Sequence, residues 1–87
     1  MLTKVPFAAR VKLKRALQPL ADRTLPELPE GTEGTIRGIL KSKFVPCHPL
    51  FRILARGIPT ERLRHEYYVE VLAYFDEFAI LPPLTEA

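Results

Sequence analysis

The sequence predicts a mainly β domain with one short helix, and three observations lead to this fold class. Side chains alternate over residues 67–75 with the period of an extended strand. Gly31 and Gly34 bracket a turn, after which Thr and Ile residues begin a segment suited to a pleated surface. Nine prolines punctuate the chain, and regular elements are expected to stop near them because proline lacks an amide donor.

Length and composition indicate one globular domain spanning residues 1–87. Hydrophobic residues make up 47% of the chain and charged residues 26%, which is ordinary globular usage. No apolar run reaches the roughly 18 residues of a membrane span, and we expect neither a signal peptide nor membrane association. The single cysteine, Cys47, excludes an intrachain disulfide and suits a reducing compartment. We therefore expect a cytoplasmic protein.

Four segments are expected to be strands. Residues 11–14 alternate apolar and charged side chains, and residues 35–40 follow the glycine-bounded turn. Residues 67–75 form the most regular strand. A turn at Asp76 and Glu77 then returns the chain as a short strand over residues 78–81, which ends at Pro82.

Residues 44–65 are expected to form an insertion between strands, with a short helix over residues 49–56. Pro49 suits the first position of a helix, and Gly57 suits its end. Arg52 and Arg56 are four residues apart and would share one helix face. The apolar face would contain Leu50, Phe51, Ile53 and Leu54.

One long helix over residues 60–79 is a second interpretation of the C-terminal half. Apolar and aromatic residues recur there every three or four positions, at Leu63, Tyr67, Val71, Tyr74 and Phe78. Thr60 would cap that helix. The density of Tyr, Val and Phe favours a strand instead, and both interpretations stay open at this point.

The order of these segments resembles small SH3-like barrels, including KOW-type and related bacterial modules. The carriers of the resemblance are Gly31-Thr32-Glu33-Gly34, Tyr67-Tyr68-Val69-Glu70-Val71 and the short segment 77–81. The resemblance implies a small barrel in which both glycines provide positive φ for the turn. It also implies that the strand at 67–75 pairs with the final short strand. The chain has no Trp, so the resemblance does not extend to domains that bind proline-rich peptides between aromatic side chains.

Charge is strongly segregated along the chain, although the formal net charge is only +3. Residues 1–18 carry basic groups and no acid, whereas residues 66–87 carry acidic groups and no base. Residues 19–34 are mainly acidic and residues 35–65 mainly basic. Folding either keeps these segments apart, which makes one basic face, or interleaves them, which neutralises the pattern.

The sequence contains no recognisable catalytic or metal-binding motif. Ser42 is the only serine, and Cys47-His48 and His65 provide too few ligands for a zinc site. We therefore expect a protein that is not an enzyme, with no cofactor, no metal and no small-molecule substrate.

Two binding functions remain as expectations. The first is contact with nucleic acid, in which basic side chains bind phosphates and aromatic side chains stack on bases. The second is a protein–protein adaptor or accessory subunit that docks on a larger complex. In both cases the insertion and its basic flank are the expected site. The candidate residues are Lys41, Lys43, Phe44, Phe51, Arg52, Arg56, Arg62 and Arg64.

Overall fold

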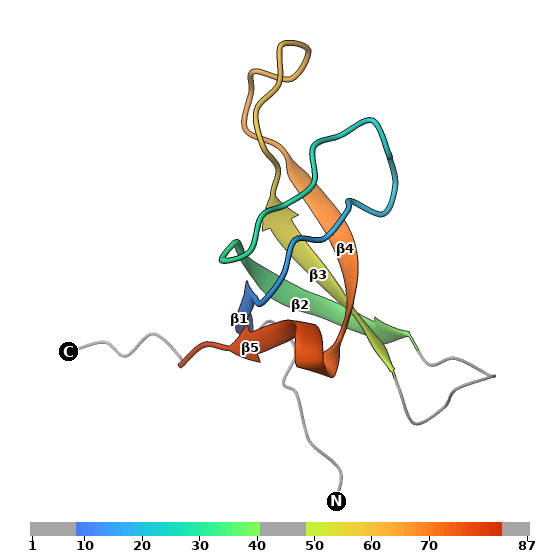
Figure 1. The fold of residues 1–87 in the computed structure, drawn as a ribbon, viewed down its shortest axis with the longest axis vertical. Coiled ribbons are helices and arrows are strands. Elements are labelled where there is room, and N and C mark those ends of the chain that lie inside the picture. Colours follow the sequence, from blue (N-terminus) through green and yellow to red (C-terminus); the bar gives the residue numbers. More distant parts are fainter. Residues whose placement is uncertain (1–8, 41–48, 83–87) are drawn as a thin grey trace, which may run out of the picture.

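A computed structural model describes residues 9–40 and 49–82 of the chain. Within these residues five short strands form one antiparallel sheet, and the only helical element is a single 3-10 turn (Figure 1). The elements are β1 (Arg10–Leu13), β2 (Glu33–Leu40), β3 (Leu50–Arg56), β4 (Tyr68–Tyr74), the 3-10 turn η1 (Phe75–Glu77) and β5 (Phe78–Ile80). The described chain has no helix that is long and apolar enough to cross a membrane.

The strands lie in the order β4-β3-β2-β1-β5, so β4 and β5 are the two edges of the sheet. Each neighbouring pair is antiparallel. Among the described residues no strand pairing joins β4 to β5, and the sheet is not closed into a barrel. The confirmed architecture is therefore a small five-stranded antiparallel β domain.

The core lies on one face of the sheet because alternate side chains of each strand point to the same side. Ile53 of β3 stands opposite Val71 of β4, and both are fully buried. Phe51 and Phe78 meet edge to face, with ring centroids 5.3 Å apart. The buried core residues are Val11, Leu13, Leu28, Ile36, Phe51, Ile53, Ala55, Val69, Val71, Ala73 and Phe78.

The two glycines of the predicted turn serve different purposes. Gly31 has φ of 92°, as the tight turn requires. Gly34 does not share this left-handed conformation, contrary to the expectation. It lies inside β2, where an added Cβ would be 2.7 Å from Ile53 and 2.8 Å from the carbonyl oxygen of Leu54. Gly34 is therefore required by the close approach of β3.

The helix predicted over residues 49–56 is wrong, because this segment forms β3. Phe51, Ile53 and Ala55 alternate on the buried face and pair with strands on both sides. Residues four apart share a face in a strand as well as in a helix, so the spacing of Arg52 and Arg56 fits either structure. The region expected to be an insertion thus contains an interior strand of the sheet, paired on both sides.

The strand interpretation of residues 67–75 is confirmed, and the long helix over residues 60–79 is wrong. The expected pairing of this strand with the final strand is also wrong, because β5 pairs with β1. The reason lies in η1, which replaces the expected two-residue turn. The side chain of Glu77 accepts a hydrogen bond from the Tyr74 amide at 2.8 Å, and the chain then crosses to β1, where Phe78 stands opposite Leu13.

Candidate partner-binding surface

The structure places the predicted site residues in different environments. Phe51 is in the core with 4% of its surface exposed, so its ring is not available to a partner. Arg52 and Arg56 lie on β3, on the face of the sheet opposite the core. Arg62 and Arg64 are exposed in the loop between β3 and β4. Lys41, Lys43 and Phe44 lie outside the described residues, as does Cys47.

The face of β3 and β4 that points away from the core forms a mixed aromatic, aliphatic and charged surface, which we call the outer face. Its members on β3 and β4 are Leu50, Arg52, Leu54, Arg56, Tyr68, Glu70, Leu72 and Tyr74. Tyr68 and Tyr74 are the most exposed aromatic side chains of the described chain, at 57% and 47%. Such side chains are enriched at protein interfaces.

Arg52 and Glu70 form a two-pronged ion pair at the centre of the outer face. The guanidinium Nη2 lies 2.7 Å from one carboxylate oxygen and Nε lies 3.3 Å from the other. The hydrogen bond with Glu70, followed by the charge of that carboxylate, raises the pKa of Arg52. Arg52 thus already holds an anion of its own chain, and a phosphate would have to displace Glu70.

Glu66 links Arg56 to Tyr68 at the upper end of the outer face. Its Oε1 accepts hydrogen bonds from the Tyr68 hydroxyl at 2.7 Å and forms an ion pair with Arg56 at 2.9 Å. The hydrogen bond from Tyr68 and then the charge of Arg56 lower the pKa of Glu66. These contacts give the Tyr68 hydroxyl a hydrogen-bond acceptor within the chain although most of the residue is exposed.

The segregated charges of the sequence are interleaved by folding. Besides the two pairs on the outer face, Arg10 contacts Glu33 at 2.7 Å and Arg15 contacts Glu77 at 3.5 Å. Each of the four ion pairs joins a basic segment of the chain to an acidic one. Of the two alternatives left open by the sequence, the structure therefore shows the neutralising one for these groups.

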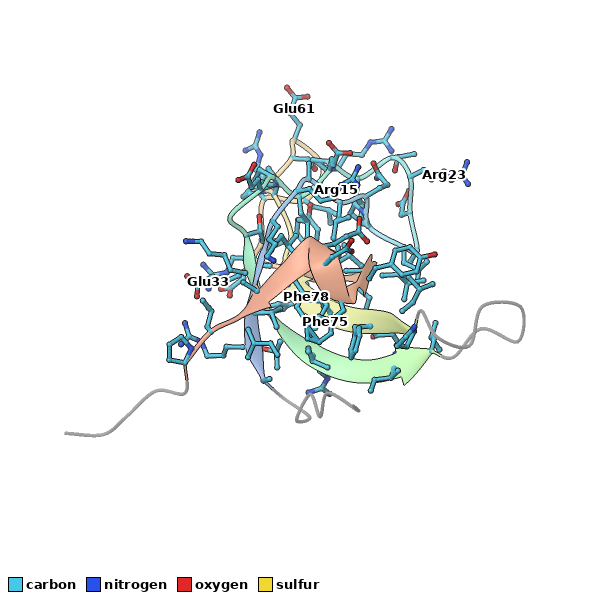
Figure 2. All side chains as sticks on the ribbon, turned by 60° about the horizontal axis from the view of Figure 1, so that its bottom comes forward. Arg15, Arg23, Glu33, Glu61, Phe75 and Phe78 are labelled. Atoms are coloured by element: carbon cyan, nitrogen blue, oxygen red, sulfur yellow. The ribbon has the colours of Figure 1, made fainter. Side chains whose placement is uncertain are left out.

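The loop between β3 and β4 projects from the sheet next to the loop between β1 and β2 (Figure 1). At its base the Gly57 amide donates to the Tyr67 carbonyl at 2.8 Å, and the Tyr67 hydroxyl donates to the carbonyl of Ile58. Figure 2 shows Glu61 at its tip and Arg23 on the neighbouring loop. Arg62 faces Asp22, whose pKa is lowered mainly by hydrogen bonds from Thr24 and to a lesser degree by the charge of Arg62.

An apolar groove of about 360 Å³ lies where the β1–β2 loop meets the edge of β4. Leu20 and Tyr68 form its exposed walls, and Leu54 contributes from the outer face. The charged side chain in its lining, Glu70, is the one already paired with Arg52. The remaining lining residues are Pro19, Ala21, Leu25, Tyr67 and Val69.

The candidate residues taken from the sequence were cations together with Phe44 and Phe51, and they included neither the exposed tyrosines nor the groove. The alternation over residues 67–75 already separates Tyr68, Glu70, Leu72 and Tyr74 from the core positions, and this mixed face was the available signal. The groove had no such signal, because it depends on where the β1–β2 loop crosses β4.

No family model, curated protein or solved structure matches this chain. In the part of the chain that the structure describes, no group of three or more His, Cys, Asp or Glu side chains could hold a metal ion.

Proposed function

We propose that this domain is a non-enzymatic protein-binding module that uses the outer face and the adjoining groove. The observation that carries the proposal is the combination of exposed Tyr68 and Tyr74 with arginines that are already paired with carboxylates. Tyrosine supplies a large contact area with a polar tip, and it loses little conformational entropy on binding. A protein partner fits this chemistry.

Nucleic-acid binding through the same region has weaker support. A polyanion approaching Arg52 or Arg56 also meets the carboxylates of Glu70 and Glu66 at hydrogen-bond distance. Phosphate binding requires these pairs to be exchanged, which removes most of the gain from releasing counterions. Phe51, the one described aromatic residue expected to stack on bases, is buried.

We also propose that the domain is a member of the SH3-like class of small barrels, left open at one side. Support comes from five short antiparallel strands and from the glycine turn that leads into β2. Further support comes from the Leu20 amide, which donates to the Glu70 carbonyl at 2.8 Å and so ties the β1–β2 loop to the free edge of β4. Such a fold is compatible with many functions, so the functional proposal rests on the surface alone.

The proposal is tested by affinity capture from the native host with and without nuclease, at low and high salt. We expect one partner protein that survives both treatments and is lost with Tyr68→Ala, because an apolar contact is insensitive to salt. Arg62→Ala/Arg64→Ala is the matched control and is expected to retain the partner.

Titration of labelled DNA and RNA tests the nucleic-acid alternative. Binding by the wild type that falls steeply with salt, and that is lost in Arg52→Ala/Arg56→Ala, would replace the protein-binding proposal with the nucleic-acid one. Capture that depends on nuclease-sensitive material would do the same.

A further inference from the structure

The two edges of the sheet differ in how well they are protected against pairing with another strand. β5 has three residues, and Pro82 follows closely. β4 has seven residues, Tyr-Val-Glu-Val-Leu-Ala-Tyr, with no Lys, Pro or Gly and with Glu70 as its only charge. Edge strands normally carry such residues because unpaired backbone groups are a template for a further strand. β4 therefore needs another form of protection.

Residues 19–21, which we call the strap, cover one position of this edge. Glu70 points its carbonyl away from β3, where it accepts the Leu20 amide at 2.8 Å. By the alternation of a strand, Leu72 and Tyr74 also direct their backbone groups outward. The Tyr74 amide donates a hydrogen bond to the Glu77 side chain. The amide and carbonyl of Leu72 have no hydrogen-bond partner among the described residues.

The strap is held to β4 by few interactions. The Leu20–Glu70 hydrogen bond is the backbone contact that joins it to the sheet in the described chain. The side chain of Leu20 is 51% exposed, and the groove of about 360 Å³ lies between the strap loop and the strands. Pro19 is buried, whereas Leu20 and Ala21 are exposed. A segment held by one buried residue and one backbone hydrogen bond opens at lower free energy than the core unfolds.

We propose that the strap is a removable cover, and that opening it allows β4 to pair antiparallel with β4 of a second copy of this chain. A two-fold axis at Leu72 satisfies the outward backbone groups, since the two Leu72 residues exchange a pair of hydrogen bonds. Glu70 then stands opposite Tyr74 of the second copy. Its carbonyl is released from Leu20 and accepts the Tyr74 amide, which exchanges its bond to the Glu77 side chain for this one. No like charges face each other across this pair of strands.

Removal of the strap hydrogen bond is the direct test. Leu20→Pro deletes the amide that binds Glu70, whereas Ala21→Pro deletes an amide that makes no such bond in the described chain. Light scattering coupled to size-exclusion chromatography is expected to show a concentration-dependent dimer for Leu20→Pro and a monomer for Ala21→Pro. Adding Leu72→Lys to Leu20→Pro is expected to restore the monomer. The lysines of the two copies would lie opposite each other at the two-fold axis, and their like charges repel.

Hydrogen exchange of the wild-type protein tests the opening step without any substitution. We expect the Leu20 amide to exchange at least roughly 100-fold faster than the Ile53 amide, because strap opening precedes unfolding. Equal exchange of the two amides would overturn the proposal. So would a folded Leu20→Pro variant that stays monomeric at high concentration, or a dimer that persists in the presence of Leu72→Lys.

Discussion

Neighbouring residues of β4 meet opposite environments, and this alternation decides what each position tolerates. Val69 and Val71 are buried at 8% and 0% exposure, whereas Tyr68 between the loop and Val69 is 57% exposed. Successive side chains point to opposite faces of the sheet. We therefore expect substitutions at positions 69, 71 and 73 to change stability strongly, and substitutions at positions 68, 70, 72 and 74 to change it less.

Val69→Asp is expected to destabilise the domain strongly. The substitution places a carboxylate in the apolar core without a partner, at a cost of about 3 kcal/mol or more. Thermal unfolding followed by circular dichroism measures the loss. Tyr68→Asp, one position away on the outer face, is the control and is expected to change the melting temperature little. A mild effect of Val69→Asp would contradict the placement of this residue in the core.

Glu66 is expected to titrate below the usual range of a glutamate. Its pKa is lowered first by the Tyr68 hydroxyl and then by Arg56, so Tyr68→Phe should raise this pKa toward its ordinary value. An NMR titration of the side-chain carboxyl carbon provides the measurement, with Tyr74→Phe as the unaffected control. Because the pKa is lower in the folded state, this contribution to stability is present above the ordinary pKa. It is lost as the pH falls through the folded-state value.

At the level of elements, the junction between β3 and the β3–β4 loop depends on a contact that only glycine permits. An added Cβ at Gly57 would lie inside the van der Waals envelope of the Tyr67 ring. Tyr67 is in turn fixed by its hydroxyl, which donates to the Ile58 carbonyl. Moving the ring aside would therefore break this hydrogen bond.

Gly57→Ala is expected to lower the free energy of unfolding by about 1–3 kcal/mol, because the methyl group forces the Tyr67 ring aside. Chemical denaturation gives the value. Gly38→Ala is the matched control, since a Cβ there would lie 3.5 Å from the Arg52 side chain, an ordinary contact. Equal stability of the Gly57 variant and the wild type would show that Tyr67 does not pack on the glycine.

The molecule as a whole has one core to which every strand contributes. Val11 comes from β1, Ile36 from β2, Ile53 from β3, Val71 from β4 and Phe78 from β5. The β1–β2 loop adds Leu28, which is fully buried. Removal of any one strand therefore exposes the packing surface of the others.

Unfolding is expected to be a single cooperative transition, as is usual for one small core. Far-UV circular dichroism follows the sheet, and tyrosine fluorescence follows residues 67, 68 and 74 at β4, without interference because the chain has no Trp. The two midpoints in denaturant should coincide. Separate transitions would mean that the region around β4 and the rest of the sheet do not unfold together.

The sequence by itself indicated the strands over residues 11–14 and 35–40, because the alternation of side chains and the bounding Gly and Pro residues are local signals. It favoured strands over residues 67–75 and 78–81 and left one helix over residues 60–79 open. It also identified the turn at Gly31, where positive φ is required. These features survive folding with changes of one or two residues at their ends.

Tertiary structure alone decided the conformation of residues 50–56, the pairing of the last strand and the environment of the candidate arginines. β3 is a strand because β2 and β4 lie on either side of it, although its apolar spacing also fits a helix. β5 pairs with β1 because η1 redirects the chain. The basic site expected from the sequence is also altered by tertiary contacts. Arg52 and Arg56 form ion pairs with carboxylates from β4 and the loop before it. Glu70 lies on β4 and Glu66 in the loop before it, and the antiparallel pairing of β3 with β4 brings both carboxylates to the arginines.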